Sequence, residues 1–145
     1  MLIPEEHYRK LERLYASAPI NEFYKPRIRI SCAQAEISVK IKPDFFHAAQ
    51  AVHGSVYFKS LDDSAFFAVN SLVFDVLVLT ASFNIYLTHP ISDGEMTAVG
   101  KVVHQSRRLF IAESVLFDSN RKEIARGSGS FMRSAIPLSE EMGYK

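Results

Sequence analysis

Residues 51–71 read AVHGSVYFKSLDDSAFFAVNS, which is one uninterrupted helical pattern. The segment contains no proline, and its single glycine, Gly54, stands near the start. Apolar side chains fall on nearly every face of the expected helix: Val56, Tyr57, Phe58, Leu61, Ala65, Phe66, Phe67, Ala68 and Val69. Because a helix that is apolar almost all round is buried, we expect the rest of the chain to pack around this segment.

Two adjacent acids, Asp62 and Asp63, interrupt the apolar centre of this helix. With about 100° between successive residues, Asp62 falls on the same stripe as Phe58 and Phe66. Asp63 instead follows Lys59 by four residues, which is the spacing of a helical ion pair. A carboxylate held against apolar packing is costly and is therefore a candidate functional group. We predict that Asp62 is that group and that Asp63 is a solvated or paired acid.

Length and composition are those of an ordinary globular protein. The chain has 145 residues, of which 48% are hydrophobic and 23% charged, so one domain over residues 1–145 is expected. The net charge of +1 gives no overall field that would attract nucleic acid. The single cysteine, Cys32, allows no intramolecular disulfide, and neither a signal peptide nor an apolar run of transmembrane length is visible. We therefore expect a cytoplasmic protein without a nucleic-acid or membrane partner.

The segments on either side of the central helix predict an α+β domain. A helix is expected over residues 4–17, a connector over 20–32, a loop over 45–52 and a tail over 137–145. Alternating apolar and polar residues predict strands at 35–41, 77–88, 95–104, 109–117 and 123–133. Short turns join the last four strands, which favours antiparallel neighbours in chain order. The predicted architecture is one long helix against one curved antiparallel sheet, with its core at about 35–133.

The start of the central helix carries His53-Gly54-Ser55, and Asp62 stands nine positions after the histidine. This pattern resembles the His-Gly-Gly motif and the following acid of hot-dog-fold acyl-CoA thioesterases. The resemblance is to the 4-hydroxybenzoyl-CoA thioesterase superfamily, in particular its phenylacetic-acid-pathway branch, and extends over about residues 35–133. The stretch Ala68-Val69-Asn70-Ser71 is also similar to the family's helix end. The resemblance implies a hot-dog fold, in which a curved antiparallel sheet wraps around one long helix.

Four positions depart from the family's usual pattern in or near the expected catalytic helix. Ser55 replaces the second glycine of the motif, and Asp63 stands where threonine or asparagine is usual. His47 falls on the position of the usual asparagine, and Gln50 on that of a glycine. These substitutions keep the first glycine and the acid but change the loop beside them. We expect Ser55, His47 and Gln50 to contact the substrate.

The resemblance implies hydrolysis of an acyl-CoA thioester, with coenzyme A as part of the substrate and no separate cofactor. The backbone N–H of Gly54, at a helix N-terminus, would polarise the thioester carbonyl. Asp62 would act as a general base toward water or attack the carbonyl directly, and both routes remain open. His53 would shape the loop or carry protons.

Thr80 falls near the position of the family's auxiliary hydroxyl group. In the expected strand 77–88, alternation places Thr80 on a polar, uncharged face with Ser82 and Asn84, opposite Leu79. On that face, Thr80 could join a catalytic site only if a second subunit covered it. The family usually builds its sites across a dimer, so we expect a homodimer or a homotetramer.

Two adjacent arginines, Arg107 and Arg108, stand in an expected turn between strands. Guanidinium groups match phosphate oxygens in a two-pronged geometry, so this pair is our candidate for binding the phosphates of coenzyme A. The alternative is that both arginines only keep a hairpin solvated. His47, His53 and Asp62 have no recognised metal-ligand spacing, and no metal is expected.

Two other functions stay open at this stage. A non-catalytic domain that binds or senses acyl-CoA would account for the substitutions at positions 47, 50 and 55. A hot-dog hydratase or dehydratase is a weaker alternative, because the chain has neither the proline-rich histidine loop nor the paired acid motif of that branch. An assay for thiol release over a panel of acyl-CoA esters separates these functions.

Overall fold

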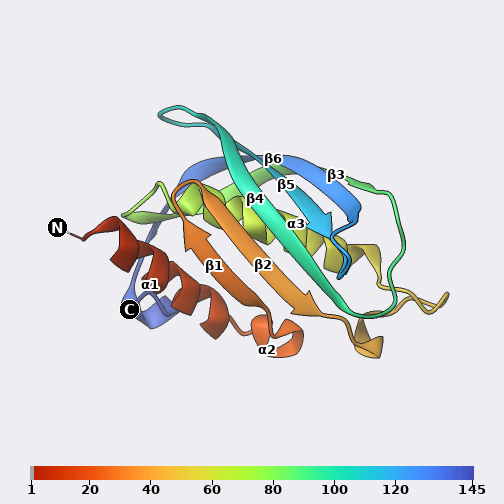
Figure 1. Cartoon of the computed structure of the whole chain (residues 1–145). Coiled ribbons are helices and arrows are strands. Elements are labelled where there is room, and N and C mark those ends of the chain that lie inside the picture. Colours follow the sequence, from red (N-terminus) through yellow and green to blue (C-terminus); the bar gives the residue numbers. More distant parts are fainter. Residues whose placement is uncertain (1) are drawn as a thin grey trace.

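A computed structural model describes residues 2–145, and Figure 1 shows how one long helix, α3, packs against a curved six-stranded sheet. The helices are α1 (Pro4–Ser17), α2 (Asn21–Tyr24) and α3 (Gly54–Asn70), with 3₁₀ turns at Pro43–Phe45 and Glu140–Met142. The strands are β1 (Arg27–Ser31), β2 (Gln34–Lys40), β3 (Val76–Leu87), β4 (Glu95–Gln105), β5 (Phe110–Phe117) and β6 (Glu123–Pro137). All strand pairs are antiparallel, which confirms the predicted α+β architecture.

The helix α3 is buried along most of its length, as its apolar pattern predicts. Fully buried apolar side chains come from its whole length and include Val56, Tyr57, Leu61, Ala65, Phe67, Ala68 and Val69. The helix begins later than residue 51 because Val52 forms an isolated β-bridge with Phe46 and His53 has extended backbone angles. His53 serves as the N-cap, and its Nδ1 accepts a hydrogen bond of 3.0 Å from the Ser55 N–H.

The strands run in the spatial order β1-β2-β4-β5-β6-β3. The prediction that the last four strands are neighbours in chain order is right for β4, β5 and β6 and wrong for β3, which pairs with β6. The segment 88–94 contains Pro90 and makes a crossing instead of a hairpin. Its Ile91 carbonyl accepts a hydrogen bond from the Val52 N–H at 2.9 Å, beside the start of α3. Strand β3 therefore ends the sheet, and its outer edge has no strand partner within residues 2–145.

A β-bulge in β3 reverses which side chains face the helix. Thr80 lies opposite Phe131, but Ser82 lies opposite Ser130, so Ala81 is the additional residue. Before the bulge Val78 and Thr80 face α3. After the bulge the odd-numbered residues face it, and the Phe83 ring lies 5.8 Å from the Phe58 ring of α3. The prediction of one continuous alternation over 77–88 is therefore wrong, because the bulge in the middle of β3 changes which residues face α3.

Two segments expected to be irregular are structured. The supposed connector 20–32 contains α2 and β1, and Ile28 of β1 pairs with Ile37 of β2. The supposed tail 137–145 folds back over α1, where Tyr144 is buried and its hydroxyl lies 2.8 Å from Nδ1 of His7. In residues 20–32, Pro26 and the interspersed basic residues obscure the strand pattern, whereas the tail at 137–145 packs on His7, which is remote in the sequence.

Glycines in β6 allow close packing across the sheet. A Cβ atom at Gly127 or Gly129 would collide with the Phe83 ring of β3, which covers both residues. Glycine within a strand often marks such a close approach of neighbouring groups. The aromatic ring fills the space that the missing side chains leave.

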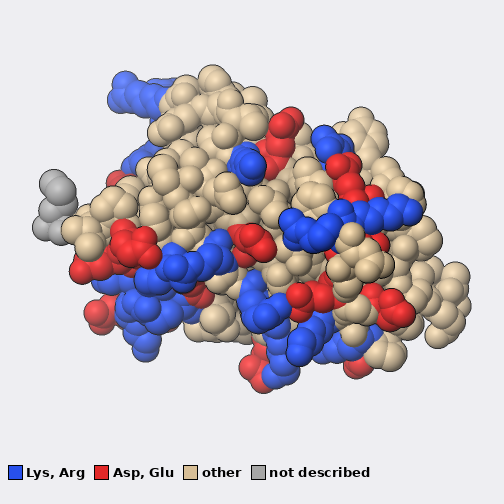
Figure 2. Space-filling view, viewed as in Figure 1, with Lys and Arg blue, Asp and Glu red and all other residues tan. Residues whose placement is uncertain are grey.

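Basic and acidic side chains are interspersed over the face shown in Figure 2. The tip of the β4–β5 hairpin projects beyond the sheet in Figure 1. Within residues 2–145, none of the helices is both long enough and apolar enough to cross a membrane.

Candidate active site

The Asp62 carboxylate lies half-buried in the middle of α3 and accepts a hydrogen bond from Thr80. The distance from Thr80 Oγ1 to Asp62 Oδ1 is 2.9 Å. The bulge in β3 makes this contact possible, because it leaves Thr80 on the face that covers α3. The expectation that Thr80 needs a second subunit to reach the site is therefore wrong, since its hydroxyl meets Asp62 within one chain.

Burial controls the acidity of Asp62. Loss of contact with water raises the pKa of the Asp62 carboxyl to about 6, and the hydrogen bond from Thr80 opposes this shift. The charge of Asp63 adds to the increase in pKa, and that of Lys59 reduces it. A carboxyl with this pKa is ionised at pH 7 and still basic enough to accept a proton. Such a pKa suits a general base.

Asp63 is a paired acid, as the helical spacing predicts. Its Oδ2 atom lies 2.7 Å from Nζ of Lys59 and accepts a hydrogen bond of 2.7 Å from the Tyr15 hydroxyl. Both partners are largely buried, so the pair is less exposed than a surface ion pair. Burial and the nearby Asp63 charge raise the pKa of Tyr15, which keeps its hydroxyl protonated. The two adjacent acids thus have different surroundings.

A hollow of about 410 Å³ opens beside Asp62 and Thr80. Its lining is mainly apolar and comes from α1, α2, α3 and β3, including Leu14, Ala18, Ile20, Phe66, Leu77 and Leu79. The contribution of α1 and α2 could not be predicted from the sequence, because helix periodicity shows which face of α1 is apolar but not what that face covers. The site therefore combines a carboxylate of perturbed acidity with a space for an apolar group.

The motif at the start of α3 lies in separate hollows. Gly54 and His47 line one of them together with Leu87, and His53 and Ser55 line another. Eight residues separate Gly54 from Asp62, which corresponds to about 12 Å along the helix axis. The structure therefore does not bring Gly54, His53, Ser55 or His47 next to Asp62 within one chain.

The Gly54 N–H remains available to a ligand. Within residues 2–145, the Ser55 N–H donates to His53 and the Val56 N–H donates to the His53 carbonyl, but no hydrogen bond uses the Gly54 N–H. A free N–H in the first turn of a helix points outward and favours negative charge. This geometry is that of an oxyanion donor.

The loop before α3 explains one departure from the expected motif. Gln50, which stands where the resembling family has glycine, has a φ angle of 64°, in the left-handed region. Glycine adopts this conformation at low cost, and the exposed Gln50 adopts it while its carbonyl accepts a hydrogen bond from Ser92. His47 is also exposed, and its Nδ1 accepts a hydrogen bond from the Ala49 N–H. Both side chains are thus free to meet a ligand.

Known proteins share this fold and part of this sequence. Residues 49–125, more than half of the chain, match the family model described as thioesterase superfamily. This chain belongs to the thioesterase superfamily. A relative from Sulfurisphaera tokodaii, described as "Putative esterase", is 28% identical over 102 residues, or 70% of this chain and 75% of the relative.

Solved structures match nearly the whole of this thioesterase-superfamily chain. The Escherichia coli PaaI protein, from the phenylacetic acid degradation operon, aligns with a TM-score of 0.85 and 16% identity, covering 95% of this chain and 100% of PaaI. A thioesterase family protein from Silicibacter pomeroyi aligns with a TM-score of 0.79 and 20% identity, covering 87% of this chain and 96% of its own. These matches confirm the predicted hot-dog fold.

Arg107 and Arg108 of this thioesterase-superfamily chain are exposed at the tip of the β4–β5 hairpin. Neither residue lines the hollow beside Asp62. Their side chains are therefore separated from the carboxylate within one chain. A role in binding the distal end of a long substrate stays a prediction.

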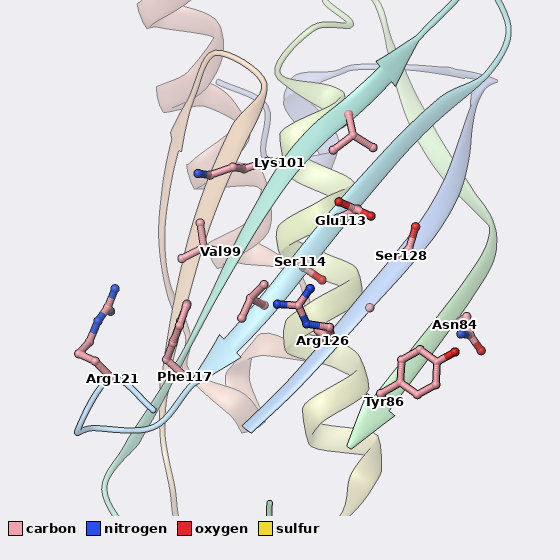
Figure 3. A pocket seen from close by; sticks show the side chains of 13 residues that line it. Asn84, Tyr86, Val99, Lys101, Glu113, Ser114, Phe117, Arg121, Arg126 and Ser128 are labelled. Atoms are coloured by element: carbon pink, nitrogen blue, oxygen red, sulfur yellow. The ribbon is translucent and has the colours of Figure 1, made fainter. Parts of the chain in front are cut away.

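A second and larger hollow, of about 490 Å³, lies on the outer face of the sheet (Figure 3). Its outward-facing residues include Lys101, Glu113 and Arg126, which come from three neighbouring strands. Gly100, which precedes Lys101 in β4 and faces the other side of the sheet, lies against the backbone of Ser64 in α3. The hollow and the helix are therefore on opposite faces of the sheet. The outer hollow is therefore separate from the Asp62 site.

Across residues 2–145, no group of three histidine, cysteine, aspartate or glutamate side chains is arranged to hold a metal ion.

Proposed function

We propose that this chain is an acyl-CoA thioesterase, which hydrolyses an acyl-CoA thioester to the free acid and coenzyme A. The observation that carries the proposal is the Asp62 carboxylate, held by Thr80 beside an apolar hollow and with a pKa near 6. Membership of the thioesterase superfamily supports a hydrolase that acts on thioesters. The whole of residues 1–145 acts as one domain in this proposal.

The reaction begins when the Asp62 carboxylate takes a proton from a water molecule. The water oxygen bonds to the thioester carbon, and the carbonyl electrons move to oxygen, where the Gly54 N–H donates a hydrogen bond. Collapse of this intermediate breaks the carbon–sulfur bond, and the departing thiolate takes the proton from Asp62. In the alternative route Asp62 attacks the carbon itself, and the carbon–sulfur bond breaks to release the coenzyme A thiolate, which takes a proton from water. A second water molecule then hydrolyses the mixed anhydride to the free acid and the Asp62 carboxylate.

The two parts of the proposed site come from two copies of the chain. One carbonyl cannot contact Gly54 and Asp62 of one helix, because they lie about 12 Å apart along its axis. The unpaired edge of β3 offers a surface for joining two sheets, and Leu79 and Leu87 are exposed along this strand. A homodimer with paired β3 edges brings the N–H of one subunit toward the Asp62 carboxylate of the other.

The proposal is tested by measuring thiol release from a panel of acyl-CoA esters. The wild-type protein and the Asp93→Asn variant should both release thiol, because Asp93 is an exposed loop residue. Asp62→Asn should lose turnover while keeping the fold. Binding of acyl-CoA without release of thiol would overturn the proposal and would instead support a binding or sensing domain.

A further inference from the structure

The N-terminal segment of the chain forms part of the hollow beside Asp62. Leu14 lies in α1, Ala18 follows its last turn, and Ile20 precedes α2. These three side chains border the same space as Leu79 of β3 and Asp62. Ala18 and Ile20 lie in the short connection between α1 and α2, which are neighbours in Figure 1.

A buried polar network fixes this segment to α3. Lys59 Nζ lies 2.7 Å from Asp63 Oδ2, 2.7 Å from Asn21 Oδ1 and 3.1 Å from the Tyr15 hydroxyl. Asn21 also donates a hydrogen bond of 2.7 Å to the Tyr15 carbonyl. The Lys59 side chain is only 14% exposed, and a buried cation of this kind is strongly destabilised when its partners are removed. The network therefore holds α1 and α2 at a set distance from Asp62.

The border formed by these residues is apolar. Leu14, Ala18 and Ile20 offer no side-chain hydrogen-bonding group, and Lys59 Nζ and Asp63 Oδ2 already pair with one another and with the Tyr15 hydroxyl. A substituent that needs hydrogen bonds would lose them on entering this side of the hollow. An aliphatic or aromatic group would instead gain from leaving water.

We propose that Leu14, Ala18 and Ile20 are specificity-determining residues, which limit the size of the apolar acyl group that lies beside Asp62. The inference rests on the proposed thioesterase function and adds the class of acyl group and the part of the chain that selects it. These residues precede the stretch 49–125 that the family model matches. Selection of the acyl group is thus assigned to a segment outside that stretch.

The test changes the space at two of these positions. Ala18→Leu adds a side chain to the hollow, and Ile20→Ala removes most of one. Ile136→Ala is the matched control, because Ile136 is a similarly exposed isoleucine on β6 that does not line the hollow. The measurement is kcat/KM for saturated acyl-CoA esters of increasing chain length, after thermal unfolding has shown that each variant is folded.

One methylene that no longer fits an apolar pocket changes kcat/KM by about 10-fold or more. Ala18→Leu should therefore lower kcat/KM at least about 10-fold for the longest substrates that the wild-type protein accepts and leave the shortest within about 2-fold. Ile20→Ala should move the preference toward longer chains, and Ile136→Ala should keep the wild-type profile. Folded variants that hydrolyse acyl-CoA with an unchanged length profile overturn the inference while the thioesterase function stands.

A wild-type protein that releases no thiol overturns the proposed function instead. The inference is then tested by calorimetry with acyl-CoA thioethers, which bind but cannot be hydrolysed. The same shift in length preference among the variants supports the size limit. Equal affinities across the variants at every chain length overturn it.

Discussion

Thr80 donates a hydrogen bond to Asp62 across 2.9 Å, from a strand that begins only after α3 has ended. The contact depends on the bulge at Ala81 and on Asn70, the last residue of α3. The Asn70 side chain accepts a hydrogen bond from the Val78 N–H and donates to the carbonyls of Val73 and Val76. Asn70 thus fixes the start of β3 so that the hydroxyl of Thr80 meets the carboxylate.

Replacement of Asp62 should separate the roles of the two acids. We expect Asp62→Asn to lower kcat about 100- to 1,000-fold, because an amide cannot take the proton. Asp63→Asn should lower kcat far less, since Asp63 already pairs with Lys59 and Tyr15. Steady-state kinetics on both variants checks this. Equal losses at the two positions would remove the assignment of Asp62 as the base.

The pH profile should report the acidity of Asp62. Because the carboxylate is the active form, kcat/KM should rise with pH and reach half its maximum near pH 6. Thr80→Val removes the hydrogen bond that lowers the pKa of Asp62, so the midpoint should move to higher pH. Thr80→Ser keeps a hydroxyl and is the control. A midpoint that stays in place in Thr80→Val would show that another group controls the profile.

The same carboxylate should reduce stability at neutral pH. The pKa of Asp62 is higher in the folded state than its ordinary value of 3.8. The free energy of unfolding therefore decreases as pH rises from about 4 through 6. Asp62→Asn should therefore stabilise the protein by about 1 kcal/mol at pH 7 and by much less at pH 4. This value is reduced because the Asp62 carboxyl is partly exposed to solvent. Urea unfolding at both pH values measures the difference. A gain of equal size at both values contradicts this origin.

Mixed dimers should reveal whether the site is shared between subunits. Gly54→Pro removes the N–H at the first position of α3, where proline is tolerated, and should lower kcat about 100- to 1,000-fold. When Gly54→Pro and Asp62→Asn chains are unfolded together and refolded, each hybrid dimer keeps one intact site. Activity should then recover to a fraction of the wild-type value. Sedimentation confirms the dimer, and an active monomer or a mixture without recovery excludes a shared site.

The hairpin arginines should affect only the coenzyme A end of the substrate. If Arg107 and Arg108 hold phosphates in the ground state and the transition state alike, their joint replacement by alanine should raise KM and leave kcat nearly unchanged. The same acyl group on a short thiol without phosphates is the control substrate, and its KM should not change. Added salt should weaken the effect, because both residues are exposed. A similar change on both substrates would place the phosphates elsewhere.

Local sequence patterns were sufficient to predict the central helix and its acids. The apolar faces of residues 51–71 predicted burial, and the spacing of Lys59, Asp62 and Asp63 distinguished the apolar acid from the paired one. Such inferences succeed because neighbours on a helix are set by its 3.6-residue turn, whatever the rest of the chain does. The resemblance at His53-Gly54-Ser55 also predicts the thioesterase superfamily, to which the chain belongs.

Long-range packing decided the remainder of the site. Residues 79–85 alternate between apolar and polar side chains, so nothing local reveals that Ala81 is bulged or that Thr80 turns toward Asp62. The pairing of β3 with β6, and the placement of Leu14 and Ile20 beside that strand, join segments far apart in the chain. Such contacts depend on which helices and strands pack against the buried faces of the sheet and of α3. Periodicity states which face of a segment is apolar, and only the tertiary structure shows what that face meets.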